Sequence, residues 1–247
     1  MSGTAAELPG VRDADIVRIA GLRFQWPGNA SFSLAVTSFA LPARSRTLLL
    51  GPSGSGKSTF LSLLCGILAP AEGRIEILGQ DIAALSSSAR DAFRAEHIGV
   101  VFQMFNLLPY GSVIDNVVLP LSFAPQRRKR VAESGGPERE ALRLLSRLGL
   151  PEELARGRSV ANLSVGQQQR VAAARALIGA PELIVADEPT SALDRDRQAA
   201  FLDLLFEQAR DAGSTLIMVS HEEAFAQRFD RVLRLDEIVS TTGGRPQ

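Results

Sequence analysis

The fold of this chain is decided by one glycine-rich stretch, Gly51-Pro52-Ser53-Gly54-Ser55-Gly56-Lys57-Ser58-Thr59. The stretch fits the pattern G-x-x-x-x-G-K-[ST] and lies between an apolar run at residues 46–50 and a helical pattern at residues 57–68. In a strand–loop–helix unit of this kind, the glycines let backbone N–H groups surround phosphate oxygens. We expect Lys57 to reach the β- and γ-phosphates of a nucleotide and Ser58 to ligate Mg²⁺. The sequence therefore predicts a phosphate-binding loop after a buried strand.

Short apolar runs and helical patterns alternate along the rest of the chain. The predicted strands cover residues 16–24, 32–41, 46–50, 74–78, 97–103, 183–186, 215–220, 230–235 and 238–240. The predicted helices cover residues 57–68, 86–95, 137–148, 165–178, 195–212 and 222–229. This alternation predicts an α/β fold with a mostly parallel sheet that is covered on both faces. The first two strands, joined by a turn at residues 26–29, predict an antiparallel β subdomain at the N-terminus.

The pattern changes between residues 104 and 159, where prolines separate helical segments. These prolines are Pro109, Pro120, Pro125, Pro137 and Pro151. We predict a helical subdomain at residues 104–159, inserted into an α/β core of residues 16–103 and 160–240, all within one domain spanning 1–247. A basic run, Arg127-Arg128-Lys129-Arg130, falls inside this subdomain. A solvated loop is the favoured interpretation of the run, and a docking surface for an acidic partner or lipid head groups is the alternative.

Composition narrows the class of protein. Lys and Arg together number 27, as do Asp and Glu, so the net charge is zero and a nucleic-acid partner is disfavoured. The single cysteine, Cys65, allows no internal disulfide and is expected to be a buried apolar residue. No apolar run approaches the roughly 20 residues of a membrane span, and residues 1–15 lack the basic and apolar regions of a secretory signal. We therefore expect a cytosolic protein that reaches a membrane only through a partner.

Polar residues follow several of the predicted strands, where the side chains of an α/β active site are usually placed. Asp187 and Glu188 end the apolar run at residues 183–186. Asp187 suits the Mg²⁺ shell, and Glu188 is placed to polarise an attacking water. Gln103 follows a buried run and could contact Mg²⁺ or that water. His221 follows the strand at residues 215–220 and could donate to the γ-phosphate, although it could also be incidental to a helix start.

A second anion site is predicted in the stretch Leu163-Ser164-Val165-Gly166-Gln167-Gln168-Gln169-Arg170, which puts a Ser/Gly turn at the start of a helix. A helix start offers unpaired backbone N–H groups and the positive end of the helix dipole. The residues alone leave open whether the two anion sites serve one nucleotide or two. Upstream of the phosphate loop, the ring of Trp26, or of Phe24, could stack on adenine, and ordinary strand packing is the alternative.

The order of these motifs resembles that of the nucleotide-binding subunit of ATP-binding cassette (ABC) transporters. The matching positions are an aromatic residue at Trp26, Walker A at residues 51–59, a Q-loop at Gln103, a signature at 163–167, Walker B at 183–188, a D-loop ending at Asp194 and a switch histidine at His221. The resemblance implies that ATP and Mg²⁺ are the cofactors and that two nucleotide-binding subunits enclose two ATP molecules head to tail. Ser164, Gly166 and Gln167 would then act on the ATP held by the partner subunit, expected to be a second copy of this chain.

Val165 departs from the family pattern, in which Leu-Ser-Gly-Gly-Gln is commoner. Because Ser164 and Gly166 are retained, we expect activity to survive. Together with residues 102–109 and 115–117, the signature resembles the lipoprotein-release, macrolide-export and DevA-type branch. This implies an ATPase at the cytoplasmic face of the inner membrane that energises a separate permease and so drives export of a lipoprotein, lipid or drug. The alternative is an FtsE-like transmembrane signalling complex. The soluble ABC proteins of DNA repair or translation are disfavoured, because the sequence shows neither the long coiled-coil insertions of the former nor the second cassette of the latter.

Overall fold

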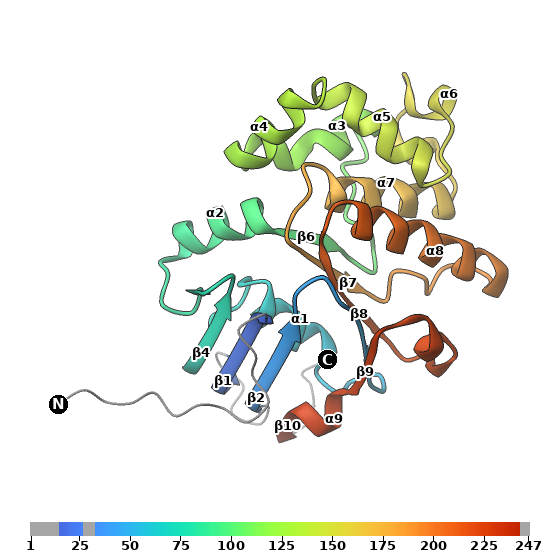
Figure 1. The fold of residues 1–247 in the computed structure, drawn as a ribbon. Coiled ribbons are helices and arrows are strands. Elements are labelled where there is room, and N and C mark those ends of the chain that lie inside the picture. The colour runs from blue at the N-terminus through green and yellow to red at the C-terminus, as the bar shows by residue number, and fades with distance from the viewer. Residues whose placement is uncertain (1–14, 27–32, 243–247) are drawn as a thin grey trace.

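Two five-stranded sheets form the centre of the computed structural model, which describes residues 15–26 and 33–242 (Figure 1). The first sheet is antiparallel and has the strand order β10-β2-β1-β4-β5. Its strands are β1 (Asp15–Gln25), β2 (Ser33–Pro42), β4 (Glu72–Ile77), β5 (Gln80–Asp81) and β10 (Val239–Thr242). The predicted antiparallel β subdomain is therefore present, and β10, the last strand among the described residues, completes its edge beside β2.

The second sheet is parallel throughout and has the strand order β6-β7-β8-β3-β9. Its strands are β6 (Ile98–Val101), β7 (Leu183–Asp187), β8 (Thr215–Ser220), β3 (Arg46–Leu50) and β9 (Arg231–Arg234). Parallel neighbours need long crossover connections, which explains the helices between the strands in the sequence. The predicted mostly parallel sheet is confirmed. Because β8 lies between β7 and β3, the segments that follow these three strands meet at one edge of the sheet.

Alternate residues of the parallel sheet face two different apolar cores. In β8, Leu216 and Met218 pack in a core with α7 (Val165–Leu177) and α8 (Arg195–Asp211). Their neighbours in β8 pack in the second core, together with α1 (Lys57–Leu64) and the antiparallel sheet. Phe60 of α1 is fully buried there, edge-to-face against Phe39 with 5.4 Å between ring centroids. Burial of such a side chain stabilises the fold by about 2 kcal/mol through the hydrophobic effect alone.

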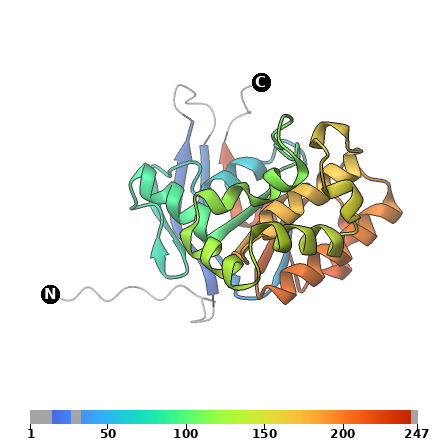
Figure 2. The same ribbon diagram turned by 90° about the horizontal axis from the view of Figure 1, so that it is seen from above.

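Helices form the side of the molecule away from β1 and β2 (Figures 1 and 2). They are α3 (Val113–Val118), η1 (Leu119–Ser122), α4 (Pro125–Glu133), α5 (Pro137–Arg147), α6 (Glu152–Ala155) and η2 (Val160–Asn162), and α2 (Ser87–His97) precedes β6. Helix α7 contacts α3 and α5 on one side and β6 on the other. A Cβ atom on Gly99 of β6 would lie 2.1 Å from the carbonyl oxygen of Ala176, so glycine is required for α7 to approach the sheet this closely.

The prediction for the basic run was wrong. Residues 127–130 lie within α4 instead of a solvated loop, and the Arg127 side chain is only 1% exposed. Pro125 begins the helix, because a missing N–H costs nothing in the first turn. Arg127 and Val131, four residues apart, form the buried face of α4. The helix could not be predicted here, because four basic residues in a row show no apolar periodicity.

Several predicted boundaries also shift. The helix after the phosphate loop ends at Leu64 and not at residue 68, because Gly66 (φ 64°) closes it. The N–H groups of Gly66 and Ile67 donate to carbonyls of the last turn at 3.0 and 2.8 Å, a Schellman motif. The helix predicted at residues 222–229 is the 3₁₀ helix η3 (Glu223–Arg228), and α9 (Leu235–Ile238) follows β9. The predicted turn at residues 26–29 lies mostly outside the described residues.

The expectation for the single cysteine is confirmed. Cys65 is buried, and this burial raises the pKa of its thiol to about 12, as expected for an apolar, unreactive cysteine. Within residues 15–26 and 33–242, no helix is long and apolar enough to cross a bilayer.

Candidate active site

The phosphate loop connects β3 to α1 as predicted, and it folds around the ammonium group of Lys57. The Lys57 side chain is buried, and its Nζ donates to the carbonyl oxygens of Gly51 (2.9 Å) and Pro52 (3.0 Å). Gly56 precedes α1 with a φ of 95°, a left-handed conformation that glycine adopts without steric cost. The loop therefore brings a buried cation together with the N-terminus of a helix, an arrangement that attracts phosphate.

Two carboxylates at the end of β7 contact this loop, Asp187 as the last residue of the strand and Glu188 directly after it. The Ser58 hydroxyl donates to Oδ2 of Asp187 at 3.2 Å, and Lys57 Nζ lies 3.3 Å from Oε1 of Glu188. The other oxygen of Glu188, Oε2, lies 3.2 Å from Nδ1 of His221, which follows β8. The strand order explains this convergence, because β7, β8 and β3 are neighbours and end at the same edge. The structure thus brings together five of the residues that the sequence singles out.

Glu188 adopts an unusual backbone conformation, with a φ of 43°. Left-handed residues other than glycine are uncommon and cost of order 1 kcal/mol. The Glu188 N–H donates to the carbonyl oxygen of Val219 at 3.0 Å, and the largely buried carboxylate lies between Lys57 and His221. These contacts offset the backbone cost and hold the carboxylate toward the phosphate loop.

Three further predicted residues lie outside this contact group. Gln103 is exposed in the turn after β6, and in the described part of the chain the hydrogen bonds between the loop and β7 do not include it. Trp26 packs edge-to-face on Phe24, with 5.3 Å between ring centroids, so the packing alternative describes this structure and adenine stacking stays a prediction. Asp194 caps the N-terminus of α8, where its Oδ1 accepts a hydrogen bond from the Arg197 N–H at 3.0 Å.

The second predicted anion site is a helix start, as expected. Ser164 is the N-cap of α7, and its Oγ accepts a hydrogen bond from the Gln167 N–H at 3.4 Å. In return, Oε1 of Gln167 accepts a hydrogen bond from the Ser164 N–H at 2.9 Å, which completes a capping box. Val165 is half-exposed. The capping box leaves the N–H groups of Val165 and Gly166 as the first-turn donors without an intrahelical acceptor.

Two buried glutamines near this site were missed by the sequence analysis. Nε2 of Gln169, in α7, donates to the carbonyl oxygen of Pro189. Nε2 of Gln198, in α8, donates to the Thr190 carbonyl at 3.2 Å and to Oε1 of Glu222 at 3.0 Å. These bonds tie both helices to the segment after Glu188. Helical spacing from the buried residues of α7 is the signal that could have identified Gln169.

The described groups fit a nucleoside triphosphate with a hard divalent cation. Lys57 and the α1 N-terminus supply positive potential for phosphate. Ser58 and Asp187 supply a hydroxyl and a carboxylate 3.2 Å apart, and oxygen donors of this kind are the ligands that Mg²⁺ prefers.

Comparison with known proteins agrees with this geometry. A family model described as ABC transporter matches residues 34–191. The chain belongs to the ABC transporter family. The matched range includes the stretches predicted as Walker A, the signature and Walker B, and the resemblance to the ABC family is confirmed.

Two relatives illustrate where the chain stands within the ABC family. It is 45% identical over 187 residues to the uncharacterized ABC transporter ATP-binding protein YbbA of Escherichia coli K12, covering 76% of this chain and 78% of YbbA. It is also 45% identical over 189 residues to the lipoprotein-releasing system ATP-binding protein LolD of Novosphingobium aromaticivorans, covering 76% of this chain and 81% of LolD.

The fold is similar to that of the ATP-binding cassette MJ0796, solved as a dimer in a post-hydrolysis state bound to ADP and Pi. The TM-score is 0.76 at 32% sequence identity, and the match covers 88% of this chain and 93% of the MJ0796 chain.

Proposed function

We propose that this chain is the ATP-hydrolysing subunit of a membrane export complex and that it works as a pair of copies. The observation that carries the proposal is the contact group of Lys57, Glu188 and His221 beside the Ser58–Asp187 pair. One site thereby combines a buried cation, a proton-accepting carboxylate and two oxygen donors for a metal ion. Phosphoryl transfer to water needs this combination, because its catalysis is mainly positioning and charge stabilisation.

In this proposal the Walker A loop and its metal ligands hold ATP. Backbone N–H groups of residues 51–59 and the Lys57 ammonium group bind the β- and γ-phosphates. Ser58 and Asp187, joined by Gln103 from the neighbouring turn, hold Mg²⁺, which neutralises phosphate charge when bound. The ring of Trp26 stacks on adenine.

Glu188 and His221 act on the attacking water. In this structure Lys57 is paired with Glu188, and a bound triphosphate would compete for the same ammonium group. Glu188 is then released to accept the proton of the water. His221, which contacts the same carboxylate, orients it and donates to the γ-phosphate.

The signature acts on a nucleotide held by another subunit. Ser164 is exposed at the start of α7, where its helix N-terminus can face an anion from outside the chain. MJ0796, with which this chain shares its fold, was solved as a dimer. We assign Ser164, Gly166 and Gln167 to the ATP of the partner copy, and the D-loop residue Asp194 to the same junction between copies.

A membrane permease is the proposed partner of the helical side of the molecule. Met104, Tyr110 and Phe123 expose large apolar side chains there. Phe123 also lines an apolar cleft of about 280 Å³ between α2, β6 and the helices that follow it. We assign the permease contact to the cleft beside Phe123, because apolar surface of this kind often marks an interaction site. The chain would then lie at the cytoplasmic face of the inner membrane, held there by the permease.

The similarity to LolD supports export over other roles. An FtsE-like signalling complex remains the second candidate, because its ATPase would use the same site. The division into an α/β core (residues 16–103 and 160–240) and a helical subdomain (104–159) belongs to the same proposal, since the partner contacts are assigned to the helical part.

Co-purification tests the proposal. The full chain is captured from membranes, its partners are identified by mass spectrometry, and Mg-ATP hydrolysis is measured on the captured complex. A permease with a large extracytoplasmic domain and an ATP-hydrolysing complex support export. Co-purification with regulators of cell-wall enzymes instead of a transport adaptor would favour signalling, and a complex that binds no ATP would overturn both candidates.

A further inference from the structure

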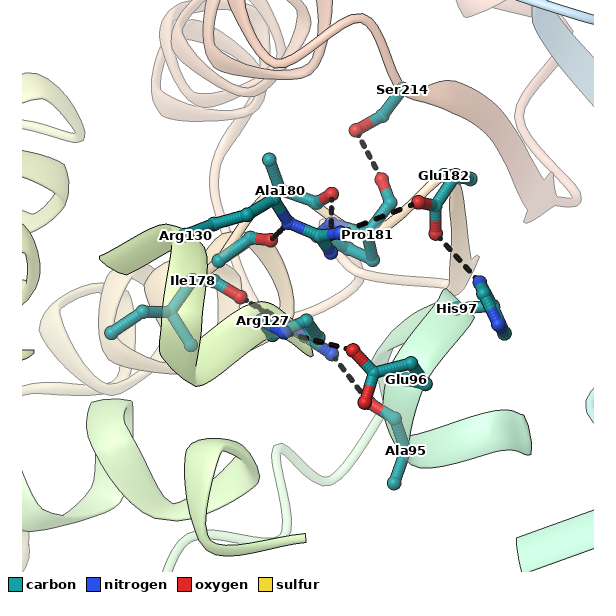
Figure 3. Close-up of polar contacts among 11 residues, drawn as sticks. Ala95, Glu96, His97, Arg127, Arg130, Ile178, Ala180, Pro181, Glu182 and Ser214 are labelled. Atoms are coloured by element: carbon teal, nitrogen blue, oxygen red, sulfur yellow. Dashed lines mark hydrogen bonds and ion pairs between the residues drawn. The ribbon is translucent and has the colours of Figure 1, made fainter. Parts of the chain in front are cut away.

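An arginine caps the end of the signature helix. Nε of the buried Arg127 donates to the Ile178 carbonyl at 2.8 Å, and Nη2 donates to the same carbonyl (Figure 3). Nη2 also donates to the Ala176 carbonyl at 3.2 Å. The last carbonyls of a helix lack intrahelical partners and carry the negative end of its dipole. Burial, reinforced by the charge of Arg130, lowers the pKa of Arg127 to about 10, so the guanidinium stays charged at neutral pH. Arg127 of α4 therefore supplies the C-terminal cap of α7.

Further polar contacts hold α4 on the core. The Arg127 N–H donates to Oε1 of Glu96 at 2.8 Å, and Nη1 of Arg127 donates to the Ala95 carbonyl at 3.1 Å, so the end of α2 is part of the same joint. Nη1 of Arg130 lies 3.7 Å from Oε1 of Glu182, at the start of β7. These contacts leave Arg127 at the meeting point of α2, α4 and α7.

Glu182 connects this joint to His97, the last residue of α2. Its Oε2 lies 3.0 Å from Nδ1 of His97 (Figure 3). Burial alone would raise the pKa of Glu182, but the hydrogen bond from His97 and the charge of Arg130 leave it below its usual value. Glu182 therefore stays ionised and pairs with Arg130.

The turn after α7 is shaped for this contact. Gly179 has a φ of 72°, and Nε of Arg130 donates to its carbonyl oxygen at 2.8 Å. A Cβ atom on Gly179 would lie 2.7 Å from the Cβ atom of Arg127 and 3.1 Å from its backbone oxygen. Helix α4 therefore lies directly on the end of α7 and would have to move if this position carried a side chain.

We propose that Arg127 is a positioning residue for ATP hydrolysis, because it fixes α7 at one end and thereby sets the placement of Ser164 at the other. The inference rests on the proposed function, in which Ser164 meets the ATP of the partner copy. Helix α7 has 13 residues and so spans about 20 Å at about 1.5 Å per residue. A tilt of about 5° at the capped end moves the signature end by about 2 Å, and a misplacement of about 1 Å can cost roughly 100-fold in rate.

The first test compares two neighbouring arginines of α4. Arg127→Met keeps an unbranched stem as far as the position of Nε but removes the guanidinium and its donors. Arg128→Met is the matched control at an exposed position. The full chain is assayed for Mg-ATP hydrolysis, equilibrium ATP binding and thermal unfolding. We expect Arg127→Met to lower kcat by about 10- to 100-fold with the Kd for ATP within about twofold, because Walker A is untouched. Arg128→Met should have the kcat and the Kd for ATP of the wild type.

Arg127→Lys provides a readout that a purely structural role would not move. Its ammonium group should recover part of kcat near neutral pH. The burial that lowers the pKa of Arg127 acts on a lysine as well, and an ammonium group loses its proton more readily than a guanidinium. As the pH is raised, kcat of Arg127→Lys should therefore fall at a lower pH than kcat of the wild type.

A second pair of variants keeps the test decisive if Arg127→Met does not fold. Gly179→Ala places a methyl group against Arg127, whereas Gly213→Ala has the same backbone cost (φ 69°) with nothing within 4 Å of its Cβ. We expect kcat to fall at least about tenfold in Gly179→Ala only. Wild-type kcat in both Arg127→Met and Gly179→Ala would overturn the inference. A loss of kcat that is matched by equal losses of ATP affinity and thermal stability would overturn it as well. A wild-type chain that binds ATP but never hydrolyses it would instead refute the proposed function.

Discussion

Glu188→Gln should separate ATP binding from ATP hydrolysis. The carboxylate of Glu188 lies between two groups, 3.3 Å from Lys57 Nζ and 3.2 Å from Nδ1 of His221. If Glu188 accepts the proton of the attacking water, the isosteric amide cannot do so. We then expect kcat to fall by about 10²- to 10⁴-fold, the usual contribution of a positioned general base.

The same substitution should strengthen ATP binding. At 3.3 Å and an effective dielectric constant of about 20, the attraction between Lys57 and Glu188 is about 5 kcal/mol before desolvation. Desolvation of two buried or largely buried ions offsets most of this attraction, leaving about 1 kcal/mol. Because bound phosphate competes with Glu188 for Lys57, removal of the carboxylate should tighten ATP binding about fivefold.

Calorimetric titration with ATP, steady-state hydrolysis and size-exclusion chromatography together measure these effects, and the variant should accumulate as an ATP-bound dimer. Glu207→Gln is the matched control, since it removes a partly exposed carboxylate of α8 that lies 3.7 Å from Arg147. Near-normal turnover in Glu188→Gln would remove Glu188 from the general-base role. Weaker ATP binding would show that the ion pair with Lys57 does not compete with phosphate.

Three further predictions address the signature, the core and the surface. Ser164→Arg should abolish turnover but leave ATP binding by the dilute chain unchanged, and a large loss of affinity in calorimetry would contradict the assignment of Ser164 to the partner's ATP. Cys65 should resist alkylation at pH 8 until the chain is denatured, because burial raises its pKa to about 12, and rapid labelling of the folded chain would contradict that burial. The hydrogen bond from Arg46 lowers the pKa of Asp230, so the pair stabilises the fold above the unfolded pKa of about 4 and loses this effect as the pH falls through the lower folded pKa. Asp230→Asn should therefore reduce the free energy of unfolding by at most about 1 kcal/mol at pH 7, because the pair is partly exposed, and by less at pH 3. Urea unfolding at the two pH values measures this difference. An equal loss at both would exclude the ion pair as the cause.

Much of the site could be predicted from short stretches of sequence. The spacing of glycines and Lys57 in one loop predicts a phosphate-binding loop, and an apolar run that ends in Asp187 and Glu188 places carboxylates at the end of a strand. These patterns are local, so they need no knowledge of the tertiary fold. The order β7-β8-β3 is what brings the three strand ends together, and no local pattern contains that order.

The prediction failed where burial depends on polar partners. Helical periodicity in the sequence detects apolar faces. Arg127 is buried for a different reason, because carbonyls from distant parts of the chain accept hydrogen bonds from its guanidinium. The carbonyl of Ile178 lies 51 residues further along the chain. The partner of Gln169 could not be predicted for the same reason, since it is the carbonyl of Pro189 in a separate segment.

The sequence by itself determined the phosphate loop, the α/β alternation and the residue types of the site, because each depends on chemistry and spacing within a few residues. Only the tertiary structure decided that Lys57, Glu188 and His221 share contacts, that β10 completes the sheet of β1 and β2, and that Arg127 caps α7. These features join residues far apart in the sequence. A buried charge is tolerated only where the folded chain supplies its hydrogen-bond acceptors, so its place cannot be read from its own neighbours.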